Sequence, residues 1–173
     1  MARAAASLIT MVSAATVLVL TMAWRPVPWV IWNASASVPT GFYRVGPIRN
    51  PVAKDLVIVM PPEPLAIFLA DRGYLPRGVP LIKPVLALAG QTVCREDLRI
   101  MVDDVYAGAA HSHDRMGRPL PEWQGCWVLR PGELFLMNAD VSDSLDGRYF
   151  GALPVSSIMG TAMQWRARVG ELD

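Results

Sequence analysis

A strong charge of either sign is lacking in this chain of 173 residues, whose formal net charge is +1. Long runs of basic residues are also missing, so the sequence offers no extended positive surface for the phosphates of a nucleic acid. Nucleic acid is therefore not an expected partner. Lysine is scarce as well, because only Lys54 and Lys83 stand among sixteen basic residues. This scarcity leaves two positions for a catalytic amine.

Cysteine is a second rare residue, with only Cys94 and Cys126 present. Neither lies in a CxxC or in another spacing typical of metal ligands. An oxidising compartment would allow the two thiols to pair, and one structural disulfide is the favoured interpretation. Two buried free thiols are the alternative.

Histidine occurs twice, as His111 and His113 in an H-x-H beside Asp114. Residues 107–125 around them are rich in Gly, Pro and polar residues, which is typical of a long exposed connection. A zinc site would need further ligands that have no evident supplier, so we expect no metal and no cofactor. A Ser-His-Asp triad built from these histidines is possible in principle, but nothing in the sequence favours it.

Apolar residues make up 53% of the sequence and are concentrated at its start. Residues 4–24 carry no charge, and an apolar helix of about 20 residues is long enough to cross a bilayer. Arg3 precedes this run, and tryptophans that suit a membrane interface follow it, namely Trp24, Trp29 and Trp32. We predict that residues 1–32 form a transmembrane anchor or, alternatively, a signal segment. Either alternative delivers residues 33–173 to the far side of the membrane.

The rest of the chain alternates short apolar runs with turn residues, which is typical of a mostly β domain. Gly73 follows the apolar positions of 63–72 and predicts one short helix closed by a left-handed cap. The segments expected to form strands are 56–62, 79–90, 98–106, 126–138 and a last one within 160–173. The predicted fold class is therefore mostly β with one short helix inserted, preceded by the N-terminal helix.

Lys83 stands alone among aliphatic residues in the segment PLIKPVLAL. Burial there would disfavour the ammonium form and lower the lysine pKa toward neutrality. A neutral amine can take the proton of a serine hydroxyl, which is the Ser-Lys form of nucleophilic catalysis. Lys54 lies beside Asp55 in a polar turn and should remain charged. The alternative is that Lys83 lies at a strand edge and extends its amine into solvent.

Three segments of the chain together resemble the motifs of type I signal peptidases. SASVPTGFYRV at 35–45 resembles the nucleophile loop, in which a serine precedes a hydrophobic residue and a proline. LIKPVLALAGQTVC at 81–94 resembles the lysine strand, and SLDGRYFGALPVSSIMG at 144–160 resembles the C-terminal box. Each motif alone is weak, but their order and spacing together are specific.

Further details resemble one branch of that family, the TraF-type conjugative-transfer signal peptidases. These details are the direct S-V-P spacing with its PTGFY continuation, DRGYLP at 71–76 and GRPLPEWQGC at 117–126. The resemblance covers most of residues 33–162. General type I signal peptidases usually have one more residue between serine and proline, a methionine after the serine and a longer catalytic domain.

The resemblance implies a role for each matching residue. Ser37 would be the nucleophile, with Lys83 as its general base. The Ser37 backbone N–H and the Ser35 hydroxyl would form an oxyanion hole. Ser144 would orient the Lys83 amine through a hydrogen bond.

Asp146 and Arg148 match the C-terminal box as well, and an ion pair between them would fix the loop that carries Ser144. A plain surface pair of small energetic value is the alternative. In the TraF-type branch the acid at this position matters for activity. The resemblance therefore ranks Asp146 above Arg148 and places it among the catalytic residues.

We therefore expect a serine endopeptidase at the inner membrane with its catalytic domain in the periplasm. Its partners would be that membrane and an exported precursor, with a conjugative pilin as the leading candidate. The resemblance also implies that the substrate's own amine can attack the acyl-enzyme, which would close the pilin into a ring. A general type I signal peptidase and a non-catalytic anchored β domain for pilus assembly are the alternatives.

Overall fold

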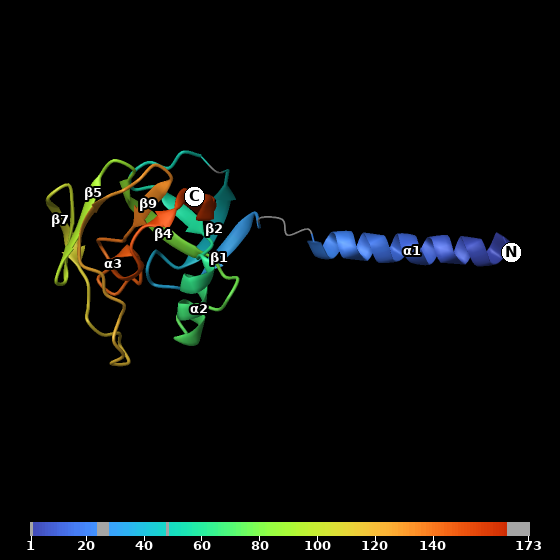
Figure 1. Ribbon diagram of the computed structural model, residues 1–173, viewed down its shortest axis with the longest axis horizontal. Coiled ribbons are helices and arrows are strands. Elements are labelled where there is room, and N and C mark those ends of the chain that lie inside the picture. The colour runs from blue at the N-terminus through green and yellow to red at the C-terminus, as the bar shows by residue number, and fades with distance from the viewer. Residues whose placement is uncertain (1, 24–27, 48, 166–173) are drawn as a thin grey trace, which may run out of the picture.

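The computed structural model describes residues 2–23, 28–47 and 49–165, whose strands form a seven-stranded and a four-stranded sheet (Figure 1). In chain order the elements are α1 Ala2–Ala23, β1 Val30–Asn33, β2 Gly41–Gly46, β3 Leu56–Val59, α2 Glu63–Asp71, β4 Leu81–Leu88, β5 Thr92–Glu96, β6 Arg99–Val102, β7 Val105–Ala109, β8 Gly125–Val128, β9 Glu133–Leu136, α3 Gly147–Phe150, β10 Leu153–Pro154 and β11 Ile158–Gln164, with a 3-10 turn at Val155–Ser157. The prediction of a mostly β domain is confirmed.

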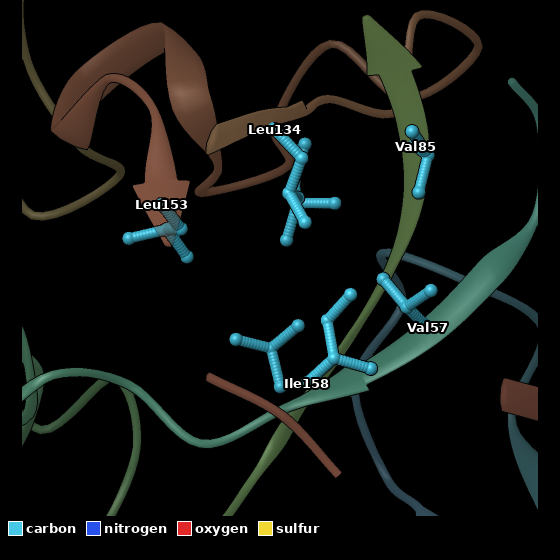
Figure 2. Close-up of a cluster of buried hydrophobic side chains, with 7 residues drawn as sticks. Val57, Val85, Leu134, Leu153 and Ile158 are labelled. Atoms are coloured by element: carbon cyan, nitrogen blue, oxygen red, sulfur yellow. The ribbon is translucent and has the colours of Figure 1, made fainter. Parts of the chain in front are cut away.

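The seven-stranded sheet has the order β1-β2-β11-β3-β4-β9-β10, and its neighbouring strands are antiparallel. Its strands contribute apolar side chains to a common core, because alternate residues of a strand point to the same face. Figure 2 shows one such cluster, formed by Val57, Val85, Leu134, Leu153 and Ile158 with two unlabelled neighbours. This packing holds β4 near the middle of the sheet.

The four-stranded sheet has the order β7-β6-β5-β8 and lies at the end of the domain opposite to β1 and β2 (Figure 1). Cys94 on β5 lies opposite Cys126 on β8 in the strand register, and a disulfide joins them. The predicted disulfide is therefore confirmed. The two cysteines are 32 positions apart, and closing a loop of this length stabilises a fold by about 3–4 kcal/mol on the chain-entropy estimate.

Two segments that were expected to be single strands each form two strands. Residues 98–106 contribute to a hairpin of β6 and β7, because Asp103 and Asp104 have φ of 49° and 65° and close a tight turn. Residues 126–138 contain β8 and β9, which belong to different sheets on either side of Pro131-Gly132. Local apolar patterns indicate that a strand exists, but they do not say which sheet it joins.

The predicted short helix is confirmed as α2, which ends one residue earlier than expected. Pro64 is tolerated near its start, because the first turn of a helix has no intrahelical partners for its N–H groups. Gly73 adopts φ +69° just after the helix, and its N–H donates to the Ala70 carbonyl at 2.9 Å. Its lack of a Cβ permits this left-handed conformation.

A helix also forms at the N-terminus, where α1 covers most of the segment predicted as an anchor or signal. Within residues 2–23, 28–47 and 49–165, however, no helix combines the length and the apolar character needed to cross a membrane.

The tryptophans expected at a membrane interface have separate outcomes. Trp24 lies outside the described residues. Trp29 and Trp32 are exposed by 87% and 57%, and Trp32 belongs to β1, which pairs with β2. Part of the segment assigned to the N-terminal unit is thus the edge strand of the larger sheet.

Candidate active site

Lys83 lies on β4, between β3 and β9 in the seven-stranded sheet. It is 2% exposed, so the alternative of a solvent-facing lysine is wrong. The pKa of Lys83 is lowered from 10.5 to about 8, mainly because the amine is buried. The Asp146 carboxylate raises this pKa and the Arg148 guanidinium lowers it, but both effects are smaller than that of burial. An amine with this pKa is half neutral in mildly basic solution and can accept a proton there.

Ser144 holds this amine in one direction. Lys83 Nζ donates a hydrogen bond to Ser144 Oγ at 2.8 Å, and Ser144 is itself 2% exposed. Ser144 lies on the connection between β9 and α3, so a loop distant in sequence reaches back to the lysine strand. This contact has the geometry that the orienting role of Ser144 requires.

Ser37 lies on the loop between β1 and β2, and the Asn33 side chain holds that loop from within. Asn33 Nδ2 donates to the carbonyl oxygens of Ser35 at 2.8 Å and of Val38 at 3.0 Å. Its Oδ1 accepts the backbone N–H of Ser35 at 3.1 Å. One buried amide therefore replaces the hydrogen bonds that a sheet partner would supply to this loop.

The hydroxyl groups of Ser35 and Ser37 are hydrogen-bonded to each other, with an Oγ–Oγ distance of 3.0 Å. Ser35 Oγ also donates to Asn33 Oδ1 at 2.8 Å. A serine hydroxyl has one hydrogen, so Ser37 must be the donor in the bond between the two serines. A role for Ser35 in an oxyanion hole therefore requires its hydroxyl to turn away from Asn33.

Asp146 and Arg148 form an ion pair with an Nη2–Oδ2 distance of 2.8 Å and side chains exposed by 0% and 1%. The alternative of a plain surface pair is therefore wrong. Asp146 also caps α3 by accepting the Arg148 backbone N–H at 3.2 Å. Gly147 between them is required by close packing, because a Cβ there would lie 2.7 Å from the Leu136 carbonyl oxygen.

The Arg148 guanidinium also gathers the carbonyl oxygens of the surrounding backbone. Its planar set of donors suits this task, since several carbonyls can be bound at once. The acceptors, at 2.7–3.3 Å, are the carbonyl oxygens of Ala109, Asn138, Val141, Ser142 and Ser144. The buried pair therefore fixes the loop that presents Ser144 to the lysine.

Ser37 and Lys83 are not directly hydrogen-bonded to each other in the described part of the chain, since they bond to Ser35 and Ser144 instead. Catalytic hydrogen bonds are often long before a substrate binds, so this geometry is compatible with pairing. A second contact reaches the nucleophile loop, because Asn138 Nδ2 donates to the Ser37 carbonyl oxygen at 2.6 Å. The loop after β9 therefore contacts both the nucleophile segment and the lysine.

Asn33 and Asn138 were not predicted from the sequence as residues of the site. Asn33 follows an apolar run and precedes a Ser-x-Ser segment, and an asparagine at a strand end often bonds to the turn that follows. That pattern could have identified it. Asn138 contacts a residue 101 positions away, and no local pattern indicates such a contact.

The side chains of His111 and His113 contact Asp143 and Ser112 rather than Ser37 or Lys83. His111 Nε2 is 3.5 Å from Asp143 Oδ1, with both side chains about half exposed, and Asp114 pairs with Arg118. Within the ranges that the structure describes, no group of three or more His, Cys, Asp or Glu residues is placed to hold a metal ion.

Comparisons with known proteins agree with the motifs. The profile of the family described as signal peptidase, peptidase S26, matches residues 2–165. The conjugal transfer protein TraF of Agrobacterium fabrum strain C58 is 41% identical over 142 residues, which cover 75% of this chain and 78% of that protein. A plasmid transfer protein TraF of Escherichia coli is 34% identical over 139 residues, covering 73% and 77% of the two chains.

Among solved structures, a signal peptidase I from Enterococcus faecalis V583 is similar with a TM-score of 0.39 and 17% sequence identity. The match covers 66% of this chain and 97% of that protein. The profile match and the identity to the TraF proteins establish the family. The chain belongs to the peptidase S26 family of signal peptidases and is a homologue of the TraF conjugal transfer proteins.

Proposed function

We propose that this protein is a serine endopeptidase in which Ser37 is the nucleophile and Lys83 the general base. The observation that carries the proposal is the buried Lys83 amine, whose pKa of about 8 and hydrogen bond to Ser144 suit a base. Family membership supports a peptidase reaction. Burying a lysine among apolar strands lowers the stability of the fold, and the proposed reaction gives a reason for this cost.

The reaction follows from these groups. Ser37 Oγ bonds to the scissile carbonyl carbon while its proton moves to the neutral Lys83 amine. The Lys83 ammonium then gives this proton to the leaving nitrogen as the C–N bond breaks, which leaves an ester on Ser37. Water attacks the ester and passes a proton to Lys83. Lys83 then returns this proton to Ser37 Oγ as the ester C–O bond breaks, which releases the acid product and the free serine.

The oxyanion formed in both steps needs hydrogen-bond donors, which can each contribute about 3–4 kcal/mol to the transition state. The Ser37 backbone N–H is one proposed donor. The Ser35 hydroxyl is the other, after its hydrogen leaves Asn33 Oδ1 and turns to the substrate. Loss of the Ser37 proton also ends the bond that Ser35 accepts from Ser37, so the bond to Asn33 Oδ1 is the one that Ser35 must exchange for the substrate.

The proposed substrate is an exported precursor protein, with a conjugative pilin as the leading candidate. The TraF relatives are described as conjugal or plasmid transfer proteins, which supports a role in transfer. The same acyl-enzyme also permits ring closure, because the substrate's own amine can replace water as the attacking group. Hydrolysis and cyclisation would therefore use the same two residues.

The proposed location of the catalytic domain is outside the cytoplasm, beside a membrane. The disulfide supports an oxidising compartment. An exposed aromatic face supports contact with an apolar surface, and it is formed by Trp29, Trp32, Phe42, Met163 and Trp165 on or beside β1, β2 and β11. A depression of about 500 Å³ lies on this face.

The test is to express the full chain, Ser37→Ala and Lys83→Ala with a conjugative pilin precursor and to weigh the products by mass spectrometry. We expect processing by the wild type and by neither variant. A product lighter by one water than the linear mature chain would reveal ring closure. Full processing by either variant would contradict the catalytic proposal and favour a non-catalytic role in pilus assembly, while cleavage of ordinary secretory precursors in a parallel assay would favour a general signal peptidase.

A further inference from the structure

Asn138 occupies a position between the nucleophile loop and the buried ion pair. Its side chain donates to the Ser37 carbonyl oxygen at 2.6 Å. Its backbone N–H donates to Asp146 Oδ2 at 3.1 Å, and its backbone carbonyl accepts from Arg148 Nη2 at 3.2 Å. One residue is therefore bonded to the nucleophile segment and to both members of the ion pair.

The same ion pair also holds the residue that orients the base. Arg148 Nη2 donates to the Ser144 carbonyl oxygen at 3.2 Å, while the Ser144 hydroxyl accepts from Lys83. A further bond joins the residue before Asn138 to the lysine strand, because the Met137 N–H donates to the Pro84 carbonyl oxygen at 3.2 Å. The loop after β9 is thus fixed to the base by several contacts.

The contacts with the nucleophile are fewer. The Asn33 side chain bonds to Ser35, Val38 and Pro39 and so fixes the shape of the Ser37 loop. Packing holds this loop near the lysine strand, because Val38, next to Ser37, is buried in one cluster with Ile82 of β4. The side chain of Asn138 makes a hydrogen bond that crosses from the base side to Ser37 itself. It acts on the Ser37 carbonyl and therefore restricts rotation of the backbone that carries the attacking hydroxyl.

We infer that Asn138 is a positioning residue, which sets the placement of Ser37 relative to Lys83 by coupling the Ser37 carbonyl to the Asp146–Arg148 pair. It touches neither of the reacting groups' own atoms, the hydroxyl oxygen and the amine nitrogen. It holds Ser37 Oγ at a distance from Lys83 Nζ that substrate binding can close into a hydrogen bond. Misplacement of a reacting atom by about 1 Å can lower a rate about 100-fold. This inference rests on the proposed Ser37–Lys83 chemistry.

The experiment compares two variants at this position with a control on the same loop. Asn138→Ala removes the donor, and Asn138→Asp keeps the shape but turns an oxygen toward the Ser37 carbonyl. Asp140→Ala is the control, because Asp140 has an exposed side chain two positions away. All are made in the full chain and assayed below their unfolding midpoints, as measured by near-ultraviolet circular dichroism.

The probe is an alanine-rich peptide boronic acid, in which boron bonds reversibly to a serine oxygen while the serine proton moves to the lysine amine. Adduct formation therefore reports the placement of Ser37 beside Lys83 without a natural substrate. We expect both Asn138 variants to bind the probe about 10- to 100-fold more weakly than the wild type. Asp140→Ala should bind like the wild type. In precursor cleavage by the two Asn138 variants, kcat should fall while KM stays close to that of the wild type.

The outcomes separate this inference from the proposed function. A wild-type protein that neither binds the boronic acid nor cleaves a precursor would overturn the proposed function, and this inference with it. Wild-type binding that is retained by Asn138→Ala and Asn138→Asp would overturn the inference alone. Failure of both variants to fold would overturn it as well, because Asn138 would then be needed for the fold rather than for placing Ser37.

Discussion

The nucleophile and the base of the proposed dyad are supported in different ways. Ser37 lies on a loop between β1, an edge strand of the larger sheet, and its neighbour β2, and the side chains of Asn33 and Asn138 hold its backbone. Lys83 lies on β4 inside the same sheet and is almost completely buried. In the nucleophile half of the site, the loop that carries Ser37 therefore depends on directional hydrogen bonds together with the packing of Val38, whereas in the base half Lys83 itself is enclosed by the packed sheet.

This difference matches what each group has to do. A general base with a lowered pKa needs a site from which water is excluded, and only the interior of a packed sheet provides that. A nucleophile must instead reach a peptide that arrives from solvent, so it cannot be enclosed. A loop shaped by short polar side chains gives access while still limiting motion.

The largest effects are expected from replacing Ser37 and Lys83 themselves. Ser37→Ala and Lys83→Met should both lower precursor processing by at least about 1,000-fold. Their effects on stability should differ, because Lys83 is protonated in the unfolded chain at pH 7 but resists protonation in the fold, where its pKa is about 8. A shift from 10.5 to about 8 corresponds to a destabilisation of about 3 kcal/mol below pH 8.

Urea unfolding at pH 7 is the measurement that checks this difference. Lys83→Met should raise the free energy of unfolding by up to about 3 kcal/mol, because it removes the buried cation. Ser37→Ala should change it by less than about 0.5 kcal/mol, as an exposed loop substitution does. A Lys83→Met protein less stable than the wild type would contradict the assignment of Lys83 to the costly half of the site.

Removal of the buried guanidinium should damage both halves together. Arg148→Met leaves the Asp146 carboxylate buried without its partner, which should destabilise the fold by about 3–5 kcal/mol. Arg115→Met is the matched control, because it breaks an exposed pair with Asp143 and should leave the urea midpoint close to that of the wild type. Equal urea midpoints for the two variants would argue against a structural role for the buried pair.

The pH dependence should report the base half alone. Lys83 accepts a proton only when neutral, so kcat should fall about tenfold per pH unit below its pKa of about 8 and level off above it. Between pH 6 and pH 8 the expected change is therefore about 50-fold, because the amine is half neutral at its pKa. The free energy of unfolding should rise between pH 8 and pH 10.5. In that range Lys83 is protonated in the unfolded chain but mostly neutral in the folded protein. A flat kcat profile between pH 6 and pH 8 would exclude a base with this pKa.

A smaller effect is expected at the nucleophile half from Asn33→Ala. The loop loses the bonds from one amide to Ser35 and Val38, so kcat should fall about tenfold, while the position of the pH limb stays unchanged. Asn50→Ala, an exposed loop substitution, should have wild-type kinetics. A shift of the pH limb in Asn33→Ala would mean that the two halves are not independent.

Much of the β domain could be predicted from the sequence, because its strands are short apolar runs bounded by Gly, Pro and Asp. The assignment of these strands to sheets could not be predicted in the same way. The chain from Cys126 to Asn138 contributes to both sheets, and Asp103 with Asp104 turns an apparent single strand into a hairpin. Such features depend on backbone conformations and partners that a local pattern does not contain.

The candidate site shows the same division. The amino-acid sequence by itself determined which groups could react, because lysine is rare and the serine, lysine and C-terminal motifs occur in one order. It also put Lys83 between aliphatic neighbours in the chain, but its burial was decided by the fold. Only the tertiary structure decided that Asp146 and Arg148 are fully buried, and that Asn33 and Asn138 hold the nucleophile loop. These contacts join distant segments, and their geometry exists only when the sheet has formed.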